Sequence, residues 1–283
     1  MNFEYTLIDE GTLKTREIID CKSDYNTKYD CVVLTCYMTS KQDPQRHIIH
    51  ESNNYEYMKP WYETMCKLGL HGIIFHDNLN DEFINKYQTD KIFFKKAVMG
   101  KYSINDERYM LYYKFLLENS YKYILMTDIS DVHINKNPFD VITDDKIFVG
   151  TNVVGKGPET NTPRWEERRK WKLDPFNKKI VDAGFDASGF HPGTKQIYSA
   201  GLLGGNYQKI MWFLIEMLNV MFLIDSVKNY NMIIFNYVIY KYLLEDYDKK
   251  TFCTKYVHTG HPFNSLFGRN EKIDESECCL IHK

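Results

Sequence analysis

Two aspartates stand directly after a short apolar run of the sequence. The run is Tyr123–Thr127, and Asp128 and Asp131 follow it in the order Asp-Ile-Ser-Asp. Two carboxylates at this spacing offer hard oxygen ligands, which with phosphate oxygens and water can complete the near-octahedral shell of Mg²⁺ or Mn²⁺. Such an ion would offset the charge that develops on a diphosphate leaving group. Aspartates that cap a turn after a strand look the same, so spacing alone leaves that simpler interpretation open.

A second candidate is the segment Tyr-Ser-Ala-Gly-Leu-Leu-Gly-Gly, residues 198–205, which precedes a predicted helix at Asn206. Small residues allow a ligand to approach the backbone closely, and a helix N-terminus can face a sugar or a phosphate. The segment matches neither the glycine pattern of dinucleotide-binding folds nor the Walker A sequence, so both of those binding modes are disfavoured. A plain tight turn before a helix would also contain Gly-Gly.

A third candidate lies near the C-terminus, where His258 stands in the segment Tyr-Val-His-Thr-Gly-His-Pro. A neutral imidazole can ligate a metal ion, and the nearby Lys255 and Arg269 can hold a diphosphate. A histidine in an ordinary loop is the simpler alternative.

The elements that must position these residues alternate between short β-rich runs and helical stretches. This alternation predicts a mostly parallel sheet flanked by helices. Ligands of such sheets bind beyond the carboxyl ends of the strands, which is where Asp128 stands. Strands are predicted at Cys31–Tyr37, Gly72–His76, 91–94, Tyr123–Thr127 and 146–150, and helices at 57–68, 107–119, 206–224 and 231–245.

Two stretches do not fit this alternation. Residues 151–194 are rich in glycine and proline around a charged patch that contains Trp165 and Trp171, and so long a loop in a compact domain is expected to be a functional lid or insertion. The flat side chains of Trp165 and Trp171, like that of Tyr198, could stack against ring-shaped ligands. The tail, residues 257–283, is predicted to be loop-like.

The length and composition are those of one globular domain. With 283 residues, 43% hydrophobic and 26% charged, the chain can bury a full core, and we expect a single domain over residues 1–283. The formal charge of −2 provides no drive toward nucleic acid or an anionic membrane. The seven cysteines include no Cys-x-x-Cys pair, which favours a reducing compartment. The N-terminus has no apolar run, and the most apolar stretch, residues 210–224, is short and contains Glu216. We therefore expect a cytoplasmic protein with no signal peptide and no membrane span.

The three candidates occur in the order found in one family, and their combination is far more specific than any of them alone. The chain resembles the nucleotide-sugar glycosyltransferases of the GT-A fold, a Rossmann-like α/β fold. Residues 123–132 resemble the strand and Asp-x-Asp metal motif of that family, here with one extra residue between the carboxylates. Residues 198–205 resemble the Ala-Gly-x-x-Gly-Gly segment that lines the donor-sugar and acceptor site. Residues 231–236 stand where the family often has Asp-Gln-x-x-x-Asn, and His258 resembles the late metal-binding histidine of glycogenin-like members.

The resemblance implies a role for individual residues. Asp131 would ligate Mn²⁺ or Mg²⁺ directly, Asp128 would contact the metal or the ribose, and His258 would be the third protein ligand. Residues of about 30–150 would form the nucleotide-sugar half and residues of about 151–270 the acceptor half. The nucleoside and its diphosphate would contact Thr35, Tyr37, Asp77, Arg108 and Lys255, and the sugar and acceptor would contact Tyr198, Ala200, Gly201 and Asn231.

The chain departs from the family at Asn231 and Met232. Some retaining relatives have a carboxylate here that acts as nucleophile or base, and neither an amide nor a thioether can do so. The implied reaction is either retaining, with front-face attack assisted by the leaving diphosphate, or inverting, with Asp182 or Asp186 as the base. The expected activity is transfer of a sugar from a nucleotide-diphosphate sugar, with a UDP-sugar as the expected donor, to a glycan or saccharide hydroxyl. The alternative is a non-catalytic glycan-binding module or a degenerate transferase.

Overall fold

The fold is known from a computed structural model that describes residues 18, 28–153, 162–185, 197–242, 257–266 and 278–282. For residues 151–153, 162–171, 242 and 257–266 the description covers the backbone alone. Within these residues, nine strands form one mixed sheet in the order β3-β2-β1-β4-β7-β6-β8-β9-β5. The strands are β1 (Cys31–Tyr37), β2 (Gly72–His76), β3 (Ile92–Lys96), β4 (Tyr123–Thr127), β5 (Val132–Ile134), β6 (Ile147–Val153), β7 (Tyr198–Asn206), β8 (Val257–Leu266) and β9 (Leu280–His282).

One half of the sheet is parallel and the other half is mixed. Strand β1 pairs in parallel with β2 and β4, and β2 pairs in parallel with β3, so these four strands end on the same edge. Strand β7 runs antiparallel to both β4 and β6, whereas β8 is parallel to β6 and β9. The short β5 closes the far edge antiparallel to β9. The predicted α/β class is confirmed, and the order β3-β2-β1-β4 is that of a Rossmann-like sheet.

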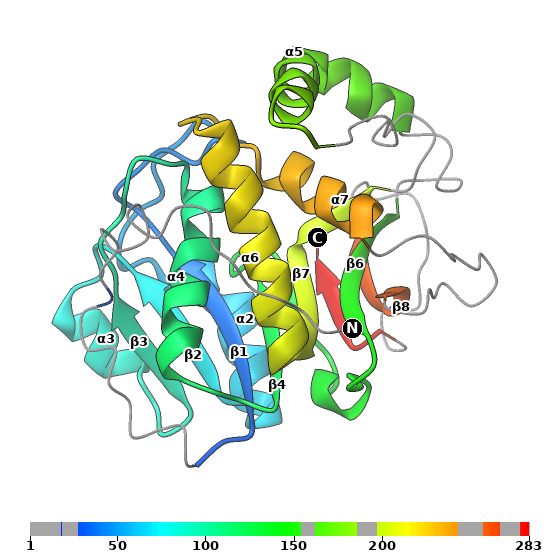
Figure 1. The fold of residues 1–283 in the computed structure, drawn as a ribbon. Helices are drawn as coiled ribbons and strands as arrows, with labels where there is room; N and C mark the ends of the chain where they lie inside the picture. The colour runs from blue at the N-terminus through cyan, green and yellow to red at the C-terminus, as the bar shows by residue number, and fades with distance from the viewer. Residues whose placement is uncertain are drawn as a thin grey trace.

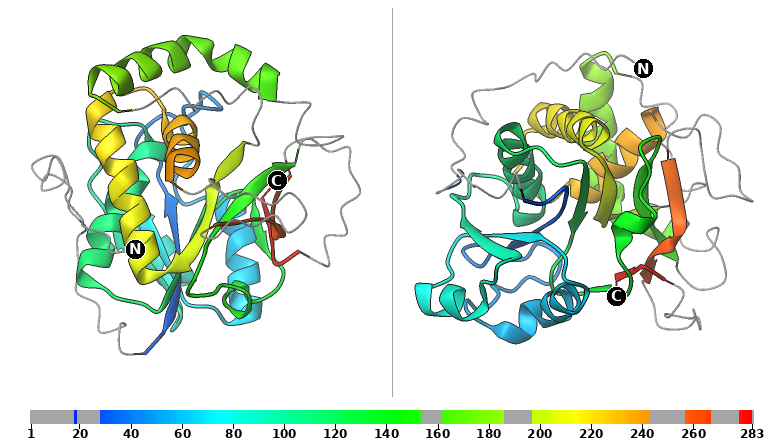
Figure 2. Two further views of the ribbon diagram at one scale, coloured as in Figure 1. Left: turned by 45° about the vertical axis from the view of Figure 1, so that its right-hand side comes forward. Right: turned by 90° about the horizontal axis from the view of Figure 1, so that it is seen from below.

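Helices cover both faces of the sheet (Figures 1 and 2). Alternate residues of a strand point to opposite faces, so Val32 and Leu34 of β1 join one hydrophobic cluster with α4, α6 and α7, while Val33 joins a second cluster with α2 and α3. The helices are α2 (Tyr55–Leu68), α3 (Asp81–Tyr87), α4 (Ile104–Glu118), α5 (Thr162–Asp182), α6 (Tyr207–Ile224) and α7 (Asn231–Tyr242), and a 3-10 turn, η2, spans Pro138–Asp140.

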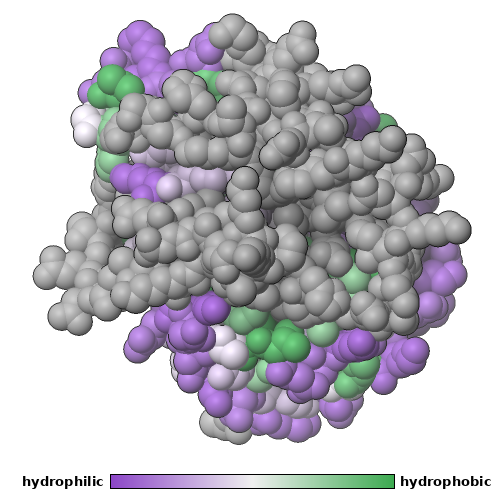
Figure 3. Space-filling view, turned by 90° about the vertical axis from the view of Figure 1, so that its right-hand side faces the viewer, coloured by the Kyte–Doolittle hydropathy of each residue, from purple (hydrophilic) through white to green (hydrophobic). Residues whose placement is uncertain are grey.

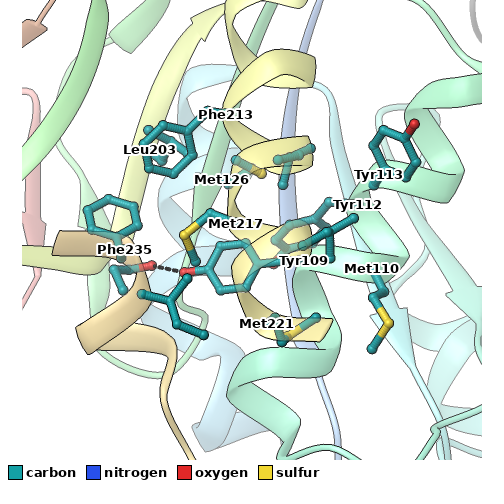
Figure 4. Packing of buried hydrophobic residues seen from close by; sticks show 14 of the residues in the cluster. Tyr109, Met110, Tyr112, Tyr113, Met126, Leu203, Phe213, Met217, Met221 and Phe235 are labelled. Atoms are coloured by element: carbon teal, nitrogen blue, oxygen red, sulfur yellow. Dashed lines mark hydrogen bonds between the residues drawn. The ribbon is translucent and has the colours of Figure 1, made fainter. Parts of the chain in front are cut away.

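Helix α4 packs against the sheet and alongside α6, and it is buried on nearly all sides. Its N-cap is Ser103, whose side chain accepts a hydrogen bond from the backbone N–H of Asp106 at 3.3 Å. Figure 4 shows Tyr109 and Tyr112 of this helix among methionines of β4 and α6. The Tyr109 hydroxyl donates to the Ala200 carbonyl oxygen at 3.0 Å. The core around α4 therefore reaches the start of β7 directly.

Asp106 is a buried carboxyl group in the first turn of α4. Its Oδ2 accepts hydrogen bonds from Ser103 Oγ at 2.6 Å and from the backbone N–H of Tyr230 at 3.3 Å, while Oδ1 has no hydrogen-bond partner among the described residues. Burial raises the pKa of Asp106 from 3.8 to about 6. Because the folded-state pKa lies above the unfolded one, the contribution of this group to stability is complete below pH 3.8 and is lost as the pH rises through about 6.

We therefore expect Asp106→Asn to remove one pH dependence of stability. In the wild-type protein the free energy of unfolding should fall by up to about 3 kcal/mol through this group between about pH 4 and pH 7. The variant should lack that decrease and should be the more stable protein at neutral pH. Urea unfolding at several pH values across this range measures the difference. An unchanged pH dependence in the variant would contradict a buried carboxyl group with a raised pKa at this position.

Both loop predictions are corrected by the structure. Residues 151–194 include the end of β6 and the helix α5, which packs against α6. Helix α5 includes two prolines of this stretch: Pro163 lies in its first turn, where proline is tolerated, and Pro175 lies inside the helix. The tail contains β8 and β9 instead of a loop. Strand β8 includes Gly260 and Pro262 at a point where its register with β6 shifts, which is where a strand accepts such residues.

The side of the molecule on which β8 and β9 lie faces the viewer in Figure 3. Among the described residues visible on this face, hydrophobic side chains form several small separate groups between hydrophilic ones.

Helix α6 is the one helix in the described part of the chain that is long and apolar enough to cross a membrane. It lies inside the protein, with 61% of its residues buried, and it packs on α4, α5, α7 and β7. Packing in the core thus accounts for its apolar sequence.

Candidate active site

A pocket opens at the carboxyl ends of β1 and β4. This is the place at which the sequence analysis predicts a ligand. The open volume of the pocket is about 890 Å³, including solvent at the mouth. Seven segments far apart in the sequence build its wall: the end of β1 with the loop after it, the start of α2, the start of α4, the turn after β4, the start of β7, the start of α7 and the end of β9. Among the residues that they contribute are Asp43, Gln45, Arg46, Asn105, Arg108, Asp128, Ser130, Asp131, Ser199, Ala200, Gly201, Asn231, Met232 and His282.

Two aspartates and a histidine meet in this pocket. The His282 Nε2 atom lies 3.3 Å from Asp128 Oδ2 and 3.3 Å from Asp131 Oδ1. The three side chains offer ligand atoms that all lie within 4.8 Å of one another. Strand β9 brings the histidine here, because Val132, the residue after Asp131, pairs with His282 in the antiparallel ladder of β5 and β9.

The donor set and its spacing fit a divalent metal ion. In an octahedral complex with bonds of about 2.1 Å, neighbouring ligand atoms are about 3 Å apart, close to the 3.3 Å between the imidazole and each carboxylate. Asp131 Oδ1 is buried and accepts no hydrogen bond of normal geometry among the described residues, so a lone pair is left for a cation. Carboxylates suit Mg²⁺ and Mn²⁺, and an added imidazole shifts the preference toward Mn²⁺.

Arg108 holds Asp128 from inside the protein. Its buried guanidinium pairs through Nη1 with Asp128 Oδ1, and Nη2 donates to the Ala200 carbonyl oxygen at 2.9 Å. Burial by itself would raise the pKa of Asp128, but the charge of Arg108 and the hydrogen bond from His282 outweigh burial and lower that pKa well below its ordinary value. Asp128 is therefore ionised and fixed in one orientation.

His282 is also held in one orientation. Its Nδ1 shares a hydrogen bond with Ser199 Oγ at 2.9 Å, which directs Nε2 toward the two carboxylates. Burial would lower the pKa of His282, but the hydrogen bonds and charges of Asp128 and Asp131 raise it to about 9. In the protein without a bound metal, the imidazolium thus supplies positive charge between the carboxylates.

Gly201 allows this close packing. A Cβ atom at this position would lie 2.5 Å from Asp128 Oδ2 and 2.7 Å from His282 Cε1. Gly205, on the same strand, has more room, since its nearest contact would be the Lys146 carbonyl oxygen at 3.4 Å. The absence of a side chain at Gly201 therefore makes room for the site's own carboxylate and imidazole.

We expect Gly201→Ala to weaken Mn²⁺ binding at least about tenfold, because the added methyl group displaces Asp128 and His282. The matched variant Gly205→Ala should bind Mn²⁺ as the wild-type protein does. Titration calorimetry with Mn²⁺ on both variants, after thermal unfolding has shown that each is folded, makes the comparison. Equal affinities would mean that contact with Gly201 does not set the position of the metal ligands.

The structure brings several of the predicted contact residues to the pocket. Arg108, Ala200, Gly201 and Asn231 line it together with Asp128 and Asp131. The N-terminus of α6, in contrast, lies at the other edge of the sheet. Because β7 is antiparallel to β4, Leu202 pairs with Thr127 at the site end while Asn206 pairs with Tyr123. The prediction that this helix N-terminus faces a sugar or phosphate is therefore wrong.

Nucleoside contacts were predicted for three residues that do not line the pocket. These residues form hydrogen bonds that support strands and loops instead. Thr35 Oγ1 donates to the carbonyl oxygen of Thr127, directly before the first aspartate, at 3.0 Å. The hydroxyl of Tyr37, buried in the core, donates to the Glu51 carbonyl oxygen at 2.8 Å. Asp77 accepts hydrogen bonds from backbone N–H groups of the loop after β1 at 2.9 and 3.1 Å.

Tyr198 is likewise part of the core. Its ring is 1% exposed and packs against Tyr240. Its backbone N–H donates to Asn236 Oδ1 at 2.8 Å, and its carbonyl oxygen accepts from Asn236 Nδ2 at 3.0 Å. This amide joins α7 to the start of β7, and so places Asn231 and the neighbouring Met232 beside the small residues of the strand.

The remaining predicted residues lie on α5, on β8 or outside the described part of the chain. Asp182 is exposed on α5, pairs with Lys178 at 2.6 Å and does not line the pocket. Asp186 and Lys255 lie outside the described residues. Trp165 and Trp171 lie on α5 and His258 lies on β8, and their side chains are outside the described part as well.

Sequence reasoning missed His282, Ser199 and Arg46. The signal for His282 was a short apolar run at the end of the chain, Leu280-Ile-His, which has the character of a strand with a polar residue at its end. Ser199 lies within a segment that was identified, but for its small residues and not for its hydroxyl. Arg46 lies in a loop with no sequence pattern that marks it.

The sequence matches no family model and no curated protein. The function is therefore inferred from the pocket and from the resemblance of its motifs.

Proposed function

We propose that this protein is a metal-dependent glycosyltransferase of the GT-A fold, which transfers a sugar from a nucleotide-diphosphate sugar, with a UDP-sugar as the expected donor, to a glycan or saccharide hydroxyl. The observation that carries the proposal is the meeting of Asp128, Asp131 and His282 with two arginines, Arg46 and Arg108, in one pocket at the carboxyl edge of a Rossmann-like sheet. The first three suit a divalent cation, and arginines suit a diphosphate. The motifs at residues 123–132 and 198–205 support the same assignment.

Each group in the pocket has a defined part in this proposal. Asp128, Asp131 and His282 would hold Mn²⁺ or Mg²⁺, which when bound offsets the charge on the leaving diphosphate. Arg108 keeps Asp128 ionised and oriented. Ala200 lines the pocket with a small side chain, which would allow a sugar ring to approach the wall at this point.

The carboxylates of the described pocket wall are already engaged by cationic groups. Asp43 pairs with Arg46 and His50, and Asp128 pairs with Arg108. Met232 cannot act as a nucleophile, and its Sδ accepts a hydrogen bond from the backbone N–H of Ala200 at 3.3 Å. This arrangement favours a reaction in which the leaving diphosphate accepts the proton of the acceptor hydroxyl over one with a carboxylate base.

The second candidate is a glycan-binding module or degenerate transferase. It is favoured by the amide of Asn231 and the thioether of Met232, which line the pocket at the position where some relatives carry a carboxylate. Such a protein would bind glycan but would have no metal-dependent affinity for a nucleotide.

Titration calorimetry with UDP, with and without Mn²⁺, separates the two candidates. A transferase should bind UDP at least about tenfold more tightly when Mn²⁺ is present, because an ion held by the two carboxylates and the imidazole would offset the charge of the diphosphate. A screen of nucleotide sugars scored by nucleotide release then identifies the donor, and NMR of the product's anomeric carbon gives the stereochemical outcome. UDP binding that is absent, or indifferent to Mn²⁺, would overturn the proposal.

We also propose a reducing, cytoplasmic location. The cysteines in the described part of the chain are free thiols, and they include the buried neighbours Cys278 and Cys279.

A further inference from the structure

Arg46 stands at the rim of the pocket, on the loop after β1, and its guanidinium bridges two aspartates. Its Nη1 lies 3.1 Å from Asp43 Oδ2, and its Nη2 lies 3.1 Å from Asp131 Oδ2. In the proposed function Asp131 is a metal ligand. Its Oδ2 atom, however, is already paired with a cation of the chain itself, the Arg46 guanidinium. Neither the motifs nor the resemblance assigns a role to this arginine.

The base of Arg46 is fixed, whereas its tip is accessible. The Asp43 side chain accepts hydrogen bonds from the backbone N–H groups of Gln45 at 2.7 Å and of Arg46 at 3.1 Å, and it pairs with His50 at 3.0 Å. The side chain of Arg46 is 47% exposed, compared with 6% for Asp43. Asp43 can therefore keep its contact with Nη1 while Nη2 leaves Asp131.

We propose that Arg46 is a latch: its charge on Asp131 Oδ2 opposes the binding of a metal ion to Oδ1 of the same carboxylate, and once displaced it contacts the diphosphate of the ligand. This inference rests on the proposed function of the same site. A half-exposed ion pair strengthens an association by a factor of about five or less, so a divalent ion can displace it. The released guanidinium would stand beside the ion, where the two positive groups repel, and a diphosphate between them removes that repulsion. The planar guanidinium also matches two phosphate oxygens at once.

The latch predicts effects of opposite sign on two binding affinities. Arg46 should weaken the binding of Mn²⁺ alone and strengthen the binding of a diphosphate in the presence of Mn²⁺. A residue that only stabilised the loop, or that only attracted anions, would not produce both effects.

The test uses Arg46→Gln and Arg46→Lys in the full chain, with Lys178→Gln as the control, since Lys178 is an exposed cation on α5 away from the pocket wall. The probes are Mn²⁺ alone, followed by electron paramagnetic resonance, and inorganic pyrophosphate with Mn²⁺, followed by calorimetry. In Arg46→Gln, Mn²⁺ should bind about two- to fivefold more tightly and pyrophosphate about tenfold more weakly. Arg46→Lys should lie between wild type and Arg46→Gln, because it keeps the charge but not the planar fork. Lys178→Gln should match the wild type in both measurements.

Each other outcome overturns part or all of the latch. If Arg46→Gln binds Mn²⁺ with unchanged or weaker affinity, Arg46 does not oppose the binding of the metal to Asp131. The same conclusion follows if neither the wild type nor the variant binds Mn²⁺. Unchanged pyrophosphate affinity would exclude the ligand contact. If pyrophosphate binds as expected but UDP does not, the proposed donor fails while the latch stands. Thermal unfolding shows whether Arg46→Gln is folded. If it is not, the test rests on Arg46→Lys. A Lys variant that binds both Mn²⁺ and pyrophosphate as the wild type does would reject the contact between the planar guanidinium and the ligand.

Discussion

Asp131→Asn is expected to abolish metal-dependent nucleotide binding and sugar transfer while the protein stays folded. The amide keeps the shape of the side chain but removes the charge that a divalent ion requires. Loss of a hydrogen-bonded neighbour of a metal ligand typically costs ten- to a hundredfold in affinity, so loss of a ligand should cost at least about a hundredfold. Calorimetry with UDP and Mn²⁺, together with the rate of nucleotide release from a UDP-sugar, measures both effects.

The stability of Asp131→Asn should be slightly below that of the wild type, and the protein should stay folded. The Asp131 side chain is 20% exposed, and the substitution weakens its pairs with Arg46 and His282, while Asp128 keeps its partners Arg108 and His282. The matched control is Asp182→Asn, which removes an exposed carboxylate on α5 and should leave metal binding and transfer unchanged. A fully active Asp131→Asn would refute the metal site, and an inactive Asp182→Asn would restore that residue as a candidate base.

Arg108→Met is expected to lower the free energy of unfolding by about 3 kcal/mol at neutral pH, the lower end of the range for breaking a buried ion pair. The lower end applies because the arginine side chain is 9% exposed and that of Asp128 is 29% exposed. The substitution leaves the carboxylate without its strongest counter-charge and the Ala200 carbonyl oxygen without the guanidinium donor. Urea unfolding gives the difference directly.

A double variant shows whether that loss comes from the unpaired charge. Arg108→Met combined with Asp128→Asn should recover at least about 1 kcal/mol relative to the sum of the single changes, because the residues interact directly. The exposed pair of Lys178 and Asp182 serves as the control cycle and should show a coupling of under about 0.5 kcal/mol. Additive effects for Arg108 and Asp128 would mean that their ion pair does not stabilise the fold.

The central strands were predictable because they carry their own evidence. Strands β1, β2 and β4 are uninterrupted runs of apolar and β-branched residues, since helices cover them on both faces. Helix α4 was predictable from its cap and its periodic aromatic residues. Strands β8 and β9 were not, because one contains glycine and proline at a register shift and the other has three residues, and both are strands through pairing with distant partners.

The residues of the candidate site likewise differ in whether the local sequence indicates them. Asp128 and Asp131 were identifiable without the structure, because a buried strand that ends in carboxylates is a local pattern and the end of a parallel strand is where ligands bind. The small residues of β7 were identifiable as well, and one of them, Gly201, proves to adjoin the carboxylate.

The histidine and the arginines that contact the two aspartates were identified from the three-dimensional arrangement of the strands and loops. His282 reaches Asp131 because β9 adds to the sheet edge beside β5, and Arg46 reaches it because the loop after β1 folds over the end of β4. Contacts of this kind depend on strand order and register, which are set by the packing of the whole sheet. The sequence around each contacting residue therefore does not indicate its partner. The same reversal of β7 that brings Ser199 and Gly201 to the site takes the start of α6 away from it.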